Sequence, residues 1–142
     1  MNHLHKFATF NILAMSILCI YPQTSIAQVN DTSAQSDRII QGKSGGSIDS
    51  QGCGYIAASP NYQMNLEQRV DYMRLTVKAT GGQPTLLVLG PNGNDSFCVL
   101  GDEISGLQPE ISGVWEAGSY QVFVGDRSGS QHQFVLDIAV EN

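Results

Sequence analysis

Short runs that are either apolar or alternate between apolar and polar residues, each closed by a turn signal, constrain the fold of this chain more than any other feature. In one of them Met73, Leu75 and Val77 alternate with polar neighbours before a break at Gly81-Gly82. The other runs are residues 85–89, 96–100, 110–115, 120–124 and 134–140. A period of two puts apolar side chains on one face of a β-strand. Several short strands at roughly ten-residue spacing, without a helical period between them, predict an all-β antiparallel β-sandwich.

The first 27 residues predict a secretory signal peptide. Lys6 precedes an apolar run from Phe7 to about Ile20, and Ser25-Ile26-Ala27 supplies small residues before a cleavage site. The run is shorter than the ~20 residues that span a bilayer, so cleavage after Ala27 is favoured over a membrane anchor. A lipoprotein site at Cys19 is an alternative, which the large residue before it disfavours. We therefore expect a secreted or periplasmic protein with no membrane span after cleavage.

Residues 28–47 are mostly small and polar, and they end in Lys43-Ser44-Gly45-Gly46-Ser47. This composition is typical of a linker and predicts a flexible lead-in over residues 28–47. The whole chain has 142 residues, which is enough for one domain of ordinary size. We expect that domain to be the β-sandwich, over residues 48–142.

Two cysteines, Cys53 and Cys98, remain after cleavage. An even pair in an exported chain predicts a disulfide, and the alternative is two buried free thiols. Closing a ring of about 45 residues stabilises a fold by roughly 4 kcal/mol in the loop-entropy treatment.

The charge balance excludes two classes of partner. The chain has 7 basic and 13 acidic residues, a formal net charge of −6, and no basic cluster. Nucleic acids and anionic membrane surfaces bind positively charged protein surfaces, so neither is an expected partner of this acidic chain.

Few residues suggest chemistry of their own. His132 is the single histidine after cleavage, and Asp126, Ser128 and Ser130 lie near it in sequence, although a solvated turn is the simpler interpretation. Zinc is disfavoured because one His and two Cys do not close a tetrahedral site, so no cofactor is expected apart from calcium. The calcium candidates are Asp102, Glu103 and Asp95, but an intervening strand would hold the two groups roughly 20 Å apart. Carboxylates for hydrolysis would come from Asp102, Glu103, Glu110 and Glu116, all in or beside predicted turns.

Three aromatic residues are candidates for ligand binding. Tyr72 and Phe123 fall on the polar phase of their strands, and Trp115 lies just before a turn. Phe123 packing against a neighbouring strand, and Trp115 filling the sandwich core, are the structural alternatives.

The sequences TLLVLGPNG at 85–93, WEAGSYQVFVG at 115–125 and FVLDI at 134–138, with Cys98 and the Asp102-Glu103 pair between them, resemble the bacterial pre-peptidase C-terminal domain family. That family is similar to the collagen-binding domains of clostridial collagenases. The resemblance covers residues 51–140 and implies a jelly-roll-like sandwich of about 7–8 strands with an accessory, non-catalytic role. No peptidase precedes the domain in this sequence, so we expect it to be free-standing.

These observations predict an exported, non-catalytic β-sandwich that contacts an extracellular or envelope polymer, such as a polysaccharide, or a partner protein. One alternative is a small secreted hydrolase that uses the acidic loop residues or His132. Another is a structural protein of envelope assembly.

Overall fold

The computed structural model describes residues 37–104 and 106–141. The predicted signal peptide and residues 28–36 of the predicted lead-in lie outside this part. The described residues form ten β-strands and no helix, which confirms the all-β prediction. Accordingly, nothing in the described part is a helix long and apolar enough to cross a membrane.

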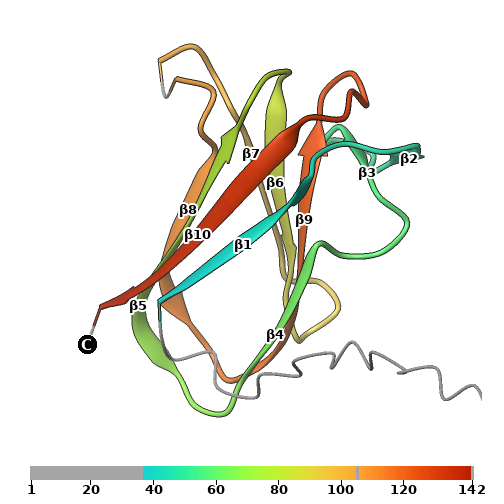
Figure 1. Ribbon diagram of the computed structural model, residues 1–142. Helices are drawn as coiled ribbons and strands as arrows, with labels where there is room; N and C mark the ends of the chain where they lie inside the picture. The colour runs from blue at the N-terminus through green and yellow to red at the C-terminus, as the bar shows by residue number, and fades with distance from the viewer. Residues whose placement is uncertain (1–36, 105, 142) are drawn as a thin grey trace, which may run out of the picture.

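One layer of the sandwich is a four-stranded antiparallel sheet (Figure 1). Its order is β1-β10-β5-β8, in which β1 is Arg38–Lys43, β10 is Gln133–Glu141, β5 is Val70–Ala79 and β8 is Glu110–Trp115. The alternation predicted for β5 is present, since Met73, Leu75 and Val77 are fully buried between the layers. Their neighbours Tyr72 and Arg74 therefore lie on the outer face of this sheet.

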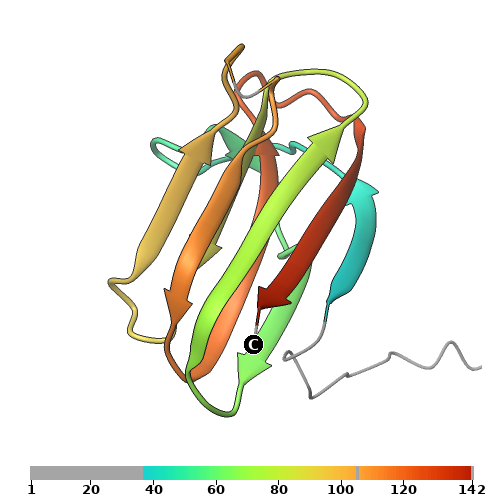
Figure 2. The same cartoon turned by 90° about the vertical axis from the view of Figure 1, so that its left-hand side faces the viewer.

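The second layer has six strands and faces the first across the core (Figures 1 and 2). Its strands are β2 (Ile48–Asp49), β3 (Tyr55–Ile56), β9 (Gly118–Asp126), β6 (Pro84–Leu89) and β7 (Ser96–Leu100), in that order, with β4 (Tyr62–Leu66) also paired to β9. Eight strands have five to ten residues, and β2 and β3 have two each. The long strands run β1-β10-β5-β8 and β4-β9-β6-β7, so the first and last are neighbours. This is the strand order of a jelly roll, as expected.

The sandwich begins earlier than the sequence analysis predicted. β1 pairs with β10 from Arg38 to Lys43, and Ile40 packs against the core, so residues 38–43 belong to the sheet and not to a lead-in. The glycines after it are not a flexible linker either, because Gly45 is buried and its N–H donates to the carbonyl of Val124 (3.0 Å). A side chain at Gly45 would overlap the carbonyl of Ser130. Here glycine allows two backbones to approach closely.

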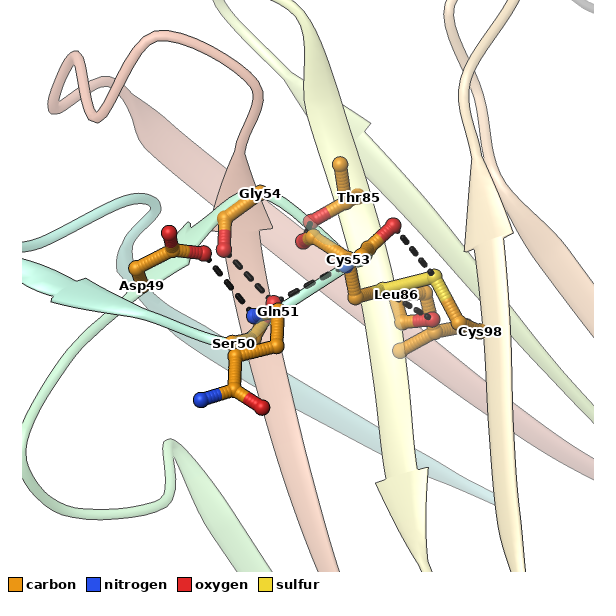
Figure 3. The surroundings of a disulfide bond; sticks show 9 residues. Asp49, Ser50, Gln51, Cys53, Gly54, Thr85, Leu86 and Cys98 are labelled. Carbon is orange, nitrogen blue, oxygen red and sulfur yellow. Dashed lines mark hydrogen bonds between the residues drawn. A yellow bond between two sulfur atoms is a disulfide. The ribbon is translucent and has the colours of Figure 1, made fainter.

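A second, smaller core lies on the outer face of the six-stranded sheet. It contains Cys53, Ile56, Leu87 and Phe123, and it is covered by residues 48–56, which we call the β2–β3 flap. The predicted disulfide between Cys53 and Cys98 is present, with the two Cα atoms 5.7 Å apart, and it ties the flap to β7 (Figure 3). The Thr85 hydroxyl adds a hydrogen bond to the Cys53 carbonyl (2.7 Å), so the flap is fixed to β6 as well.

Candidate functional site

A pocket opens between the two layers, on the side where β7 and β8 are the outermost strands (the gold and orange strands at the left of Figure 2). Its volume is about 170 Å³. A cavity of roughly 150 Å³ holds a benzene-sized group, whereas sites for drug-sized ligands occupy roughly 300–1,000 Å³. The pocket therefore suits a single side chain. We call it the edge pocket, and its lining residues are Asp95, Phe97, Ile111, Ser112, Val114, Trp115, Glu116 and Tyr120.

Two aromatic rings form the inner wall of the edge pocket. Trp115 is 4% exposed, and its indole N–H donates to the carbonyl of Met73 (2.9 Å). The Tyr120 ring meets it edge to face, with centroids 5.2 Å apart and planes at 67°. Both residues are thereby held in one orientation, so this wall is preorganised for a ligand.

Two acidic residues, Asp95 and Glu116, also line the edge pocket. The Tyr120 hydroxyl donates to the main-chain carbonyl of Glu116 (3.0 Å). Burial raises the pKa of Tyr120, and the negative charges of Glu116 and Asp95 raise it further, against the opposing effect of that hydrogen bond. The phenol therefore stays protonated, and both carboxylates are close enough to its oxygen to act on it. The Arg69 Nε lies 3.9 Å from the Glu116 carboxylate, but this arginine is exposed and closer to Asp71 (3.3 Å), so it neutralises the charge of Glu116 weakly.

The outer rim of the edge pocket is apolar. Phe97 on β7 is 50% exposed and Val114 on β8 is 54% exposed. Ile111, also on β8, is partly buried against the main core. An exposed apolar rim around a preformed pocket is typical of a surface that a partner covers.

The residues that line the edge pocket carry charge of one sign. They include two acids, Asp95 and Glu116, and no lysine or arginine. In the sequence, the chain has no lysine or arginine between Ala79 and Asp126, and the same span contains six acids, namely Asp95, Asp102, Glu103, Glu110, Glu116 and Asp126. A cationic group is therefore the ligand that the charge of the pocket lining favours.

The three predicted ligand-binding aromatics do not share a surface. Trp115 lines the edge pocket, and Tyr72 lies half-buried on the outer face of the four-stranded sheet. Phe123 is on the outer face of the other sheet, but it is 6% exposed because the β2–β3 flap covers it. The expectation of a ligand contact at Phe123 is corrected: it packs against neighbours, as the structural alternative proposed.

The predicted calcium ligands are not brought together either. Asp95 precedes β7, whereas Asp102 and Glu103 follow it, so the length of that strand separates them. Across residues 37–104 and 106–141, no three His, Cys, Asp or Glu side chains are grouped as a metal site requires. Asp95 and Asp102 are seven positions apart in sequence, and β7 places them at its opposite ends.

The residues around His132 form a closed turn and not a catalytic arrangement. The fully buried carboxylate of Asp126 accepts hydrogen bonds from the Gln83 N–H (2.7 Å), from the N–H and hydroxyl of Ser128 (2.8 and 2.7 Å) and from the Ser130 N–H (3.2 Å). Burial acts to raise the pKa of Asp126, but these hydrogen bonds outweigh it and hold the pKa below its ordinary value. His132 is not among the donors to Asp126 in the described part of the chain, so the acid does not orient the imidazole.

The remaining acidic candidates are also dispersed. Glu110 accepts a hydrogen bond from the Thr76 hydroxyl (3.1 Å) on the four-stranded sheet, and Glu116 lies at the edge pocket. Trp115, Asp95 and Glu116 are each candidates from the sequence for a different kind of site, and no sequence pattern groups them with Phe97 and Tyr120. The long span without lysine or arginine is the sequence signal that would have drawn attention to this side.

The fold and the edge pocket define a class of protein: a jelly-roll sandwich with a side-chain-sized pocket at its open edge. An uncharacterized protein of Synechococcus elongatus, Synpcc7942_2126, is 37% identical over 131 residues, which cover 88% of this chain and 92% of that protein. The chain belongs to the same family as that protein. Among solved structures, PliG of Aeromonas hydrophila, a periplasmic inhibitor of g-type lysozyme, is similar with a TM-score of 0.44 and 14% identity, over 76% of this chain and 89% of PliG.

No protein-family model matches the chain. The resemblance to the pre-peptidase C-terminal domains therefore stays a prediction from the sequence.

Proposed function

We propose that this protein is an exported, non-catalytic binding module whose edge pocket accepts a lysine or arginine side chain of a partner protein. The observation that carries the proposal is a pocket of about 170 Å³ with an aromatic wall and two acidic residues in its lining. Long basic side chains combine an apolar stem with a charged end. The stem fits beside Phe97 and Trp115, and the charged end reaches Asp95 and Glu116.

The interactions available to such a side chain favour it over a neutral one. A cation near Asp95 and Glu116 gains charge-assisted hydrogen bonds, and the neighbouring Trp115 and Tyr120 rings add cation–π attraction of about 0.5–2 kcal/mol. An anionic side chain would meet two like charges and be rejected. The partner is therefore expected to present a positively charged side chain to the pocket.

A protein partner is favoured over a polysaccharide because of how the aromatics are buried. Sugar rings stack on exposed aromatic faces, but the two rings of the pocket wall, Trp115 and Tyr120, are almost completely covered. Phe97 is the single exposed aromatic residue among those that line the pocket, so the pocket has no row of aromatic faces for a sugar chain. Export is supported by the N-terminal signal pattern and by the Cys53–Cys98 disulfide, since such bonds persist in oxidising compartments.

The test uses a small probe and an internal reporter. Trp115 is the single tryptophan of the chain, so its fluorescence reports on the pocket wall alone. The probe is lysine with acetyl and methylamide caps, and the control is norleucine with the same caps, which lacks the charge. At roughly 0.3 kcal/mol per atom, a ligand of about 14 non-hydrogen atoms binds with a Kd of about 1 mM.

Capped lysine should change Trp115 emission saturably, and capped norleucine should bind at least about fivefold more weakly, a factor within reach of one charge-assisted hydrogen bond. The double variant Asp95→Asn/Glu116→Gln should lose this preference. A matched control, Asp137→Asn, removes a charge from the outer face of the four-stranded sheet and should keep it. Equal binding of the two probes, or an unaltered double variant, would contradict the proposal.

A further inference from the structure

β7 is an edge strand whose outer side is free in the described part of the chain: it pairs with β6 on one side, and no strand pairs on the other. Its sequence, Ser-Phe-Cys-Val-Leu, contains no charged residue, glycine or proline. The edge strand at the far side of the other sheet, β1, by contrast begins at Arg38 and ends at Lys43. Charged residues within an exposed edge strand protect it against pairing with other chains, and β7 has none within its bounds. The charges next to β7, Asp95 before it and Asp102-Glu103 after it, are all negative, so they repel acidic chains and not basic ones.

The hydrogen bonds between β6 and β7 show which groups of β7 are available. The N–H of Gly90 donates to the Asp95 carbonyl (2.6 Å), and the N–H of Gly101 donates to the Pro84 carbonyl (3.0 Å). Hydrogen-bonded pairs alternate along an antiparallel ladder, so Phe97 and Val99 bond to β6 as well. The main-chain N–H and C=O groups of Ser96, Cys98 and Leu100 therefore point away from β6, toward the open edge.

The same alternation relates this edge to the edge pocket. Cys98 points to the outer face, where it is bonded to Cys53, so Phe97 points to the opposite face and lines the edge pocket. A strand added to β7 would form non-hydrogen-bonded pairs at Phe97 and Val99, where Cα atoms are about 4.5 Å apart. Its residue opposite Phe97 would have its side chain on the same face as Phe97, beside the pocket.

We propose that an extended segment of the partner protein adds to β7 as an antiparallel strand and inserts a lysine or arginine, opposite Phe97, into the edge pocket. This inference rests on the proposed function and adds how the partner is held. The charge of the site selects this occupant. In-register antiparallel pairing with a second copy of β7 would bring Asp95 of each copy next to the Asp102-Glu103 pair of the other, and like charges repel. A basic segment meets the opposite field.

The probe is a capped seven-residue peptide with lysine at position 4, valine at positions 2 and 6, and threonine at the odd positions. When lysine lies opposite Phe97, threonines 3 and 5 pair with Cys98 and Ser96. N-methylation of these two threonines removes N–H groups that face β7. N-methylation of the two valines is the matched control, because their N–H groups face away.

The unmodified peptide should change Trp115 emission at a concentration at least about tenfold lower than capped lysine does, because each added main-chain hydrogen bond contributes to binding. N-methylation of the threonines should abolish most of this gain, and N-methylation of the valines should change the affinity by less than about twofold. Bound peptide should also slow hydrogen exchange of the Ser96, Cys98 and Leu100 amides. Amides of Phe97 and Val99, already bonded to β6, should respond less.

A variant of the protein tests the same contact. Ser96→Pro removes an N–H that faces the open edge, at the first residue of β7, where proline is tolerated. It should weaken peptide binding by about fivefold, the equivalent of one hydrogen bond, and leave binding of capped lysine unchanged. Ser96→Ala is the matched control and should bind both probes normally.

The two proposals fail in different ways. If capped lysine binds but the peptide binds no more tightly, or if the two N-methylated peptides bind equally, strand addition is overturned and the side-chain pocket stands. If neither capped lysine nor the peptide alters Trp115 emission, the proposed function fails.

Discussion

Removing the Cys53–Cys98 disulfide with the double variant Cys53→Ala/Cys98→Ala should lower the unfolding temperature strongly. The bond closes a ring with a sequence separation of 45. The loop-entropy relation gives about 13 cal/mol/K for a ring of that size, or about 4 kcal/mol at 25 °C. Without residues 1–27 the chain has 115 residues and an unfolding entropy of roughly 0.24 kcal/mol/K, so this free energy corresponds to a decrease in Tm of about 16 °C.

The assay is a thermal melt followed by circular dichroism, on the chain without residues 1–27 and without reductant. The matched control is Leu100→Ala, a partly exposed residue on the same strand, which should lower Tm by only about 2–4 °C. A decrease of less than about 5 °C for the double variant would refute the reasoning, because it would mean that the unfolded chain gains little freedom when the ring is opened.

Three further changes have defined outcomes. Asp126→Asn removes a carboxylate whose pKa is lowered in the folded state. The charged carboxylate stabilises the fold above its unfolded pKa of 3.8, and this stabilisation is lost as the pH falls. The free energy of unfolding of the variant, measured in urea, should therefore depend less on pH below about 4 than that of the unmodified protein. Trp115→Phe leaves the Met73 carbonyl without its indole donor and should cost about 1–3 kcal/mol by urea denaturation, and an unchanged midpoint would contradict this. Gly82→Ala, at φ +77°, places a Cβ against the Asp126 carboxylate and should destabilise more than Gly52→Ala, where φ is +142° but nothing lies within 4 Å; equal melting temperatures would show that the contact is not tight.

The strands that could be predicted are those whose own sequence shows the alternation. Met73, Leu75 and Val77 in β5 have the period of a half-buried strand, and they are buried as that period requires. β1 was missed because its strand pattern is short and runs directly into small polar residues. Its place in the sheet comes from pairing with β10, a partner about 100 residues away, which no local pattern reports.

The edge pocket could not be predicted from the sequence for a related reason. Asp95, Trp115 and Tyr120 come from separate strands and turns, and they meet only because β7 and β8 are both outermost in their sheets. The burial of Phe123 likewise depends on residues that are distant in sequence. The phase of this residue along β9 was predicted correctly, but its burial depends on the β2–β3 flap, which the disulfide holds over it.

The pairing of the first strand with the last affects the order in which this chain can fold. β1 finds its hydrogen-bonding partner only when β10, at residues 133–141, has been synthesised. Before β10 is present, β5 and β8 are the strands of the four-stranded sheet that can pair with each other. Completion of the sheet must therefore wait for a loop closure across nearly the whole domain, which is slow. That delay suits the proposed export, in which the polypeptide crosses a membrane while still unfolded and forms its disulfide on the far side.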